Sequence, residues 1–338
     1  MNKFNLLECT LRDGGYITGW NFGGQTIRDI IAGLSESNYD FIEVGYLNNK
    51  PYKEGSTQFN NIEQITEYLP TERKNAIYLA MADVQQFLPE NITPYSGKSI
   101  EGIRVVFYKH QIEEAITLGK AVIKNGYKLF MQPMVTIDYS MDEFVMLAKE
   151  INELNPFAVS IVDSFGYMIK SDFRQYYRIL DNLLSENIII GFHSHNNMNL
   201  ALINAQDILE YQTERKIIID STMYGMGRGA GNLHTELISN YYNITLGEKY
   251  DLNKVMGMIG KFILPIFERS KWGYSPYYLI TALYHCHPNY VAYLLQERLV
   301  TVSEFMEFVK MIPREMYTKC QKTYVLQLYD RFKKKYHD

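Results

Sequence analysis

A chain of 338 residues exceeds a common single domain but accommodates one α/β barrel with an appended region. Its net charge of −4, with both signs interspersed, provides no basic face for nucleic acid. Three cysteines in a chain of this length predict reduced thiols, and no apolar run reaches the roughly 20 residues that span a membrane. Because the N-terminus has no signal-peptide core, we expect a cytoplasmic protein.

Short apolar runs alternate with helical patterns over the first 245 residues. The runs are Phe4–Glu8, Phe41–Gly45, Ala76–Met81, Gly102–Phe107, Lys128–Pro133, Ala158–Val162, Ile188–Phe192 and Ile217–Asp220. Helical spacing occurs between them, as in Gln25–Ser37, Ile112–Asn125, Met141–Asn155 and Ser171–Glu186. Nearly continuous hydrophobicity is typical of parallel strands buried on both faces. The repeats predict a (β/α)8 TIM barrel over residues 1–245, with an open flavodoxin- or Rossmann-like sheet as the alternative.

After about residue 245 the pattern becomes helical only. Helices are expected at Asp251–Arg269, Pro276–Leu295, Ser303–Lys310 and Lys322–Lys335. These segments predict a small all-helical C-terminal region over residues 246–338. Since no low-complexity linker precedes it, we expect this region to pack directly on the barrel.

Unusual polar residues follow the predicted strands, at the end where a TIM barrel gathers its functional groups. His193 and His195 stand two residues apart on an extended backbone, so their side chains project to the same side. Two imidazoles and a carboxylate form a metal site with open positions, and Asp13 at the end of strand one is the natural carboxylate. Asp13 could instead form an Asx-turn or a helix cap. The same ligand set occurs in non-haem iron oxygenases, which the predicted barrel makes less attractive.

Arg12 precedes the proposed carboxylate ligand. Its guanidinium could hold a substrate carboxylate or stabilise an enolate oxygen, or it could form a structural ion pair with Glu8 or Glu43. The two roles are compatible, because pairing can orient a catalytic arginine. Four glycines in Gly225–Asn232 allow the backbone to approach the site closely. Asn232 is a further candidate metal or substrate contact, or an N-cap of the next helix.

In combination, these motifs resemble the metal-dependent pyruvate aldolases of the HMG-CoA lyase-like barrels, also called DRE-TIM metallolyases, which include 4-hydroxy-2-oxovalerate aldolases. The matching stretches are Thr10–Gly15, Ile42–Gly45, Asp163–Gly166, His193–Asn197 and Gly225–Asn232 with Glu236. The resemblance covers roughly residues 4–240. It implies reversible aldol cleavage of a 4-hydroxy-2-oxo acid into pyruvate, or a similar 2-oxo acid, and an aldehyde.

The resemblance also implies a divalent metal cofactor. Asp13, His193 and His195 would bind Mn2+, with Mg2+, Co2+ or Zn2+ as the other ions considered. Asn232 is added to this set as a predicted metal ligand. Asp13 and His193 also count as substrate-binding residues, because a chelated substrate would lie beside them.

Further residues are predicted to contact the substrate or to take part in catalysis. By resemblance, Arg12 stabilises the pyruvate enolate, Ser164 touches substrate, and Tyr278 matches a substrate-facing tyrosine of the aldolases. Glu43, the expected partner of Arg12, is placed with the catalytic residues. Tyr16 stands where the aldolases place a histidine base, and a phenol with an ordinary pKa near 10 is a poor base at neutral pH. His285 or His287 of the helical region, or a metal-bound water, is an alternative base.

Two other functions stay open at this point. One is a Claisen-type synthase or lyase that uses an acyl-CoA with the same metal and arginine, although the glycine-rich loop lacks the cysteine of HMG-CoA lyases. The other is a catalytically altered barrel that acts as a partner subunit. A homodimer is possible, and the resemblance raises an aldehyde dehydrogenase as a further partner. We expect neither nucleic acid nor membrane as a partner.

Overall fold

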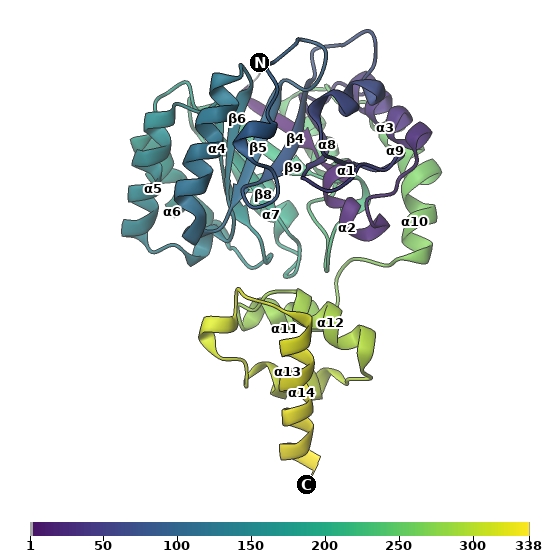
Figure 1. The fold of residues 1–338 in the computed structure, drawn as a ribbon, viewed down its shortest axis with the longest axis vertical. Helices are drawn as coiled ribbons and strands as arrows, with labels where there is room; N and C mark the ends of the chain where they lie inside the picture. Colours follow the sequence, from purple (N-terminus) through teal and green to yellow (C-terminus); the bar gives the residue numbers. More distant parts are fainter. Residues whose placement is uncertain (1–2, 338) are drawn as a thin grey trace.

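The computed structural model describes residues 3–337 as a closed barrel with a helical region at one end (Figure 1). The strands pair in parallel in the order β1-β9-β8-β7-β6-β5-β4-β2, and a β1–β2 pairing closes a barrel of 8 strands. Their bounds are β1 (Phe4–Glu8), β2 (Phe41–Leu47), β4 (Ile77–Asp83), β5 (Gly102–Phe107), β6 (Lys128–Pro133), β7 (Ala158–Asp163), β8 (Ile189–Ser194) and β9 (Ile217–Ser221). The predicted TIM barrel is therefore confirmed.

The predicted strands differ from the observed ones mainly at their carboxyl ends. Strand β2 continues past Gly45 because the register shifts between Glu43 and Tyr46, which keeps the chain paired with β4. It also pairs with a short additional strand, β3 (Gln58–Phe59). Strand β8 includes His193, so this histidine sits on the barrel wall instead of in the following loop.

Helices surround the strands, and each buries one apolar stripe against them. Their bounds are α3 (Gly24–Glu36), α4 (Ile112–Lys124), α5 (Met141–Leu154), α6 (Lys170–Leu183), α7 (Ala201–Leu209) and α8 (Thr235–Leu246). In α3 the buried stripe is Ile27, Ile30, Ile31 and Leu34. Between β2 and β4, and again between β4 and β5, 3-10 turns (Ile62–Tyr68 and Pro89–Asn91) take the place of a helix. Among residues 3–337, no helix is both long and apolar enough to cross a bilayer.

The C-terminal helices belong to two different cores. Helices α9 (Leu252–Met258) and α10 (Leu264–Arg269), joined by a π-helical turn, bury side chains such as Val255 and Ile263 in the barrel core, which extends to Trp272. A second core is built by α11 (Pro276–Leu283), α12 (Asn289–Glu297), α13 (Val302–Val309) and α14 (Lys322–His337). The change of pattern at residue 245 thus marks the end of the strand–helix repeats, and the second core begins after Trp272.

The helical region lies at the barrel end away from the chain's N-terminus (Figure 1). Since β1 begins near that terminus, the region faces the carboxyl ends of the strands. Backbone N–H of Gly273 donates to the Gly229 carbonyl at 3.1 Å, and Trp272 Nε1 donates to the Tyr224 carbonyl at 2.9 Å. These bonds fasten the beginning of the region to the glycine-rich loop after β9.

A glycine of this loop, Gly231, can be tested against a control glycine on α9, Gly257. Gly231 has φ +78°, and a Cβ there would lie 2.1 Å from the Gly225 carbonyl oxygen. We expect Gly231→Ala to lower the free energy of unfolding by about 2–3 kcal/mol, through strain and displacement of the loop. The same substitution at Gly257, on α9 with open space around it, should raise that free energy by about 0.5–1 kcal/mol. Urea unfolding measures both, and equal effects would contradict this account.

Candidate active site

A cavity of about 290 Å³ lies at the carboxyl ends of the barrel strands. The predicted site residues that line it are Arg12, Asp13, Tyr16, Ser164, His193 and His195. His287 and Pro288, from the segment between α11 and α12, complete its wall from the helical region. This volume lies at the lower end of the range for small-molecule sites, so it suits a small acid.

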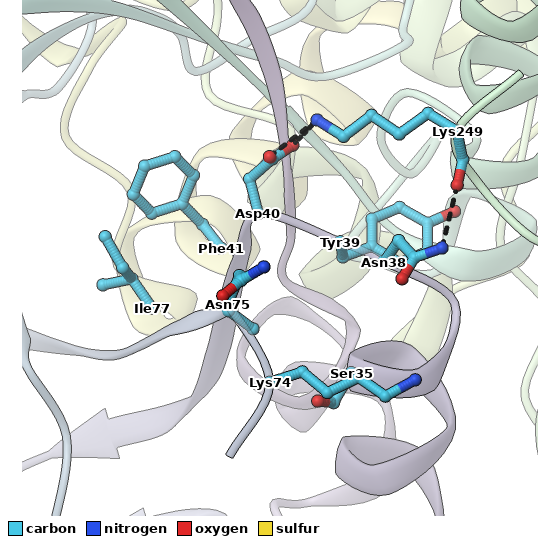
Figure 2. A pocket seen from close by; sticks show the side chains of 10 residues that line it. Ser35, Asn38, Tyr39, Asp40, Phe41, Lys74, Asn75, Ile77 and Lys249 are labelled. Atoms are coloured by element: carbon cyan, nitrogen blue, oxygen red, sulfur yellow. Dashed lines mark hydrogen bonds and ion pairs between the residues drawn. The ribbon is translucent and has the colours of Figure 1, made fainter. Parts of the chain in front are cut away.

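A larger cavity of about 680 Å³ opens at the opposite end of the barrel. Figure 2 shows Lys249 directing its ammonium group at the Asp40 carboxylate, and Nζ lies 2.6 and 2.7 Å from the two carboxylate oxygens. Asp40 immediately precedes β2, so this cavity lies at the amino ends of the strands, where a TIM barrel is stabilised. Its only lining carboxylate is already paired, and we therefore assign the chemistry to the smaller cavity.

Arg12 is fixed in place by two carboxylates. One helical turn, α1 (Thr10–Asp13), follows β1 directly and turns Arg12 and Asp13 into the barrel. The Nε of Arg12 donates to Glu43 Oε2 at 2.7 Å, and Nη1 donates to Asp13 Oδ1. Nη2 is buried and has no hydrogen-bond partner among the described residues. Arg12, which lines the cavity, therefore keeps one unused donor nitrogen.

His193 bridges two buried aspartates. Its Nδ1 lies 3.0 Å from Asp220 Oδ2, and its Nε2 lies 3.6 Å from Asp13 Oδ2. Asp220 also accepts from Arg104, and although burial opposes it, the charge of Arg104 and the hydrogen bond from His193 lower the pKa of Asp220. A carboxylate that accepts the Nδ1 proton leaves the Nε2 lone pair directed toward Asp13. This is the orientation that a metal-binding histidine requires.

The donor atoms at this point fit a divalent cation. Ligand atoms of Cys9, Asp13 and His193 all lie within 4.8 Å of one another. Burial raises the pKa of the Cys9 thiol, and its Sγ donates to the Ser221 carbonyl at 3.3 Å, so it stays protonated and is a poor ligand. The remaining oxygen and nitrogen donors suit hard or borderline ions such as Mn2+, Mg2+, Co2+ or Zn2+.

The local charge balance also favours a cation. Arg12 and Arg104 pair with Asp13, Glu43 and Asp220, which leaves one formal negative charge on this buried network while His193 is neutral. An uncompensated buried negative charge is costly, and a divalent cation would offset it and leave one positive charge for an anionic substrate to balance.

His195 and Asn232 lie beside this set, and their roles as ligands stay predictions. The ring centroid of His195 is 5.3 Å from that of His193, and burial lowers the pKa of His195 to about 3, so its imidazole is neutral. The amide of Asn232 donates from Nδ2 to the Met226 carbonyl at 3.0 Å, while its buried Oδ1 has no partner among the described residues. Both residues thus offer a free acceptor.

Other predicted residues take different positions. Glu43, predicted to be catalytic, does not line the cavity, and its Oε2 accepts from both Arg12 and Arg104, so in this structure it positions Arg12. Tyr278 is also absent from the cavity lining, and its ring lies against Gly229. Ser164 does line the cavity, and its hydroxyl accepts from the Val135 backbone N–H at 2.8 Å.

Sequence reasoning missed three functional side chains. Arg104 is a charged residue inside an otherwise apolar predicted strand, and Asp220 ends another, which were usable signals. Arg228 lies within the glycine-rich stretch but received no role. Of the two alternative bases, His287 lines the cavity, whereas His285 stacks on Tyr167 with ring centroids 4.4 Å apart and does not line it.

Substitution of Asp220 tests whether this carboxylate orients His193. We expect Asp220→Asn to weaken metal binding by about 10- to 100-fold, because the amide no longer holds His193 as the carboxylate does. The variant should also lower the free energy of unfolding by about 3–5 kcal/mol, since Arg104 loses a buried partner. Calorimetric titration with Mn2+ and urea unfolding measure the two effects. Unchanged metal affinity would show that Asp220 does not orient His193.

Comparison with known proteins shows which family and which relatives this chain is similar to. Residues 99–259 match the model of the HMGL-like family. The 4-hydroxy-2-oxovalerate aldolase of Thermomicrobium roseum is 28% identical over 274 residues, which cover 77% of this chain and 73% of that protein. The oxaloacetate decarboxylase of Mycobacterium tuberculosis is 22% identical over 236 residues, which cover 69% of this chain and 68% of that protein.

Solved structures share the fold of this chain. The N-terminal domain of a proposed aldolase from Bacteroides vulgatus superimposes with a TM-score of 0.72 at 26% identity, covering 91% of this chain and 97% of that one. The HMG-CoA lyase of Brucella melitensis shares the fold, with a TM-score of 0.63 at 16% identity over 79% of this chain and all of its own (100%). Residues 99–259 of this chain thus match the HMGL-like family model, and the chain is similar in sequence to named aldolases and in fold to an HMG-CoA lyase.

Proposed function

We propose that this chain is a metal-dependent aldolase that interconverts a 4-hydroxy-2-oxo acid with pyruvate, or a similar 2-oxo acid, and an aldehyde. The observation that carries the proposal is the fixed guanidinium of Arg12, whose Nη2 is unused beside the Asp13–His193 pair. A preorganised donor stabilises developing negative charge without reorganisation during the reaction. The relatives named 4-hydroxy-2-oxovalerate aldolase support the same reaction class.

Asp13 and His193 would hold the divalent cation, with His195 and Asn232 as further ligands. When bound, the cation acts as a Lewis acid toward the 2-oxo group and as a template for the substrate. Mn2+ is our first choice, since carboxylate oxygen and imidazole nitrogen both suit it.

The protein's own residues orient and stabilise the reacting acid. Arg12 Nη2 donates to the oxygen that becomes the enolate oxygen when the carbon–carbon bond breaks. Glu43 keeps the guanidinium in that position, and Ser164 lies on the cavity wall, where it contacts the substrate. The helical region closes over the cavity with His287 and Pro288, which limits access of water to the enolate.

The proton of the 4-hydroxyl must also be removed, and His287 is poorly suited to this task. Its Nδ1 accepts the Asn289 backbone N–H at 3.0 Å, so the neutral ring carries its proton on Nε2. Burial lowers the pKa of His287 to about 3, which keeps the ring in that neutral form. Tyr16 lines the cavity and stays our candidate for this step, a role that requires a phenol more acidic than an ordinary tyrosine.

Activity with purified protein tests the proposal. With Mn2+ and pyruvate, we expect condensation with at least one member of an aldehyde panel. Chromatography detects the 4-hydroxy-2-oxo acid that forms. Arg12→Lys should lower kcat by about 10²- to 10³-fold while metal still binds, because Lys cannot reproduce the fixed donor. No product with any aldehyde, despite bound metal, would count against an aldolase. Thiol release from acetyl-CoA with a 2-oxo acid would favour a Claisen-type enzyme.

Metal content tests the ligand assignment separately. We expect His193→Ala and Asp13→Asn to lose stoichiometric Mn2+, because each removes a donor from the buried set. His285→Ala is the matched control, since this histidine stacks on Tyr167 outside the cavity. Elemental analysis after dialysis gives the readout. Full metal content in both ligand variants would refute the assignment.

A further inference from the structure

Arg228 brings a second guanidinium into the active-site cavity. It belongs to the glycine-rich loop after β9 and lines the cavity together with Arg12. Its guanidinium carbon lies 4.0 Å from the ring centroid of Tyr16, so the side chain is placed by a cation–π contact. Among residues 3–337, no carboxylate forms an ion pair with Arg228. Its charge is therefore available to a ligand.

His287 provides a hydrogen-bond donor on the same wall. Only 8% of this residue is exposed, and its Nδ1 is occupied by the Asn289 backbone N–H. The neutral ring therefore presents Nε2–H, and the positive charge of Arg228 is one of the influences that keep the ring neutral. A neutral donor beside a free cation favours an anionic acceptor.

The two carboxylates that line the cavity already have partners. Asp83 lines the cavity, but its Oδ1 accepts the Gln85 backbone N–H at 2.8 Å, and the Tyr46 hydroxyl bonds to its carboxyl group. Asp13, the other cavity carboxylate, pairs with Arg12. Neither carboxylate lies within ion-pair distance of Arg228, so neither neutralises it.

A substrate with a single carboxylate would leave this cation unused. In the proposed reaction, Arg12 and the metal site serve the 2-oxo acid end. A neutral aldehyde would then place apolar atoms beside a partly buried guanidinium, which loses water without gaining a partner. An aldehyde with its own negative charge would supply that partner.

We infer that Arg228 and His287 form an anion subsite, and that the aldehyde half of the substrate carries a carboxylate or a phosphate. The inference rests on the proposed aldol reaction for the position of the aldehyde half. The recognition itself is a binding property, so it can be measured without turnover.

Binding of unreactive 2-oxo acids tests the subsite directly. 2-Oxoheptanedioate carries a distal carboxylate, 7-methyl-2-oxooctanoate replaces that group with a neutral isostere, and neither has a 4-hydroxyl to cleave. With Mn2+ present, we expect calorimetry to show the dianion binding at least about tenfold tighter. Arg228→Met should bring the two affinities close together, and Arg228→Lys should keep part of the preference. Arg174→Met, whose arginine pairs with Asp207 outside the cavity, controls for net charge.

The two sources of anion are separated by turnover with pyruvate. 4-Oxobutanoate is compared with 4-methylpentanal for a carboxylate, and glyceraldehyde 3-phosphate with glyceraldehyde for a phosphate. Equal affinity for the charged and neutral analogues, or a preference that survives Arg228→Met, would overturn the subsite and leave Arg228 as a support for Tyr16. A charge preference in binding without any turnover would keep the subsite and refute the aldolase.

Discussion

Arg104 lies fully buried inside the barrel, where it donates to Glu43 and Asp220 at once. Charges in such a place are tolerated only when each has a partner, because desolvation costs several kcal/mol for an ion. Glu43 then holds Arg12, and Asp220 holds His193. Arg104, on β5, thus positions both Arg12 and His193 through the two carboxylates that it holds. Because removing any member leaves an unpaired buried charge, the network has little freedom to rearrange.

This rigidity suits the chemistry of an enolate. Negative charge that develops on an oxygen is stabilised most by donors that already point at it. Arg12 meets this condition because two of its nitrogens are occupied and the third is not. The same network carries one excess negative charge beside Asp13 and His193, which favours a divalent cation at that point. The cation and the guanidinium would therefore act on the same end of the substrate.

The other end of the substrate meets a different part of the chain. The glycine-rich loop carries Arg228, and the helical region contributes His287. The indole N–H of Trp272 and the backbone N–H of Gly273 donate to carbonyls of the segment after β9, and these bonds hold the beginning of the helical region against the glycine-rich loop. The barrel strands thus supply the groups proposed to act on the 2-oxo acid. The loop and the helical region supply the groups that would select the charge of the aldehyde half.

The sequence by itself determined the barrel and the meeting of Asp13 with His193. Nearly uninterrupted apolar runs are typical of parallel strands, and Gly102–Phe107 and Lys128–Pro133 are observed with the predicted bounds. Since all carboxyl ends of such strands meet at one end of a barrel, residues 180 positions apart could be placed together.

Only the tertiary structure decided which buried charges pair and which side chains reach the cavity. Arg104 meets Asp220 across the barrel interior, and that contact depends on strand stagger, which local spacing does not encode. The distinction between His285 and His287 depends on the turn between α11 and α12, where His285 has φ +56°. Tyr278 lies against Gly229 and outside the cavity wall because packing of the helical region sets its direction. Long-range packing fixes these contacts, and no pattern within a single segment contains it.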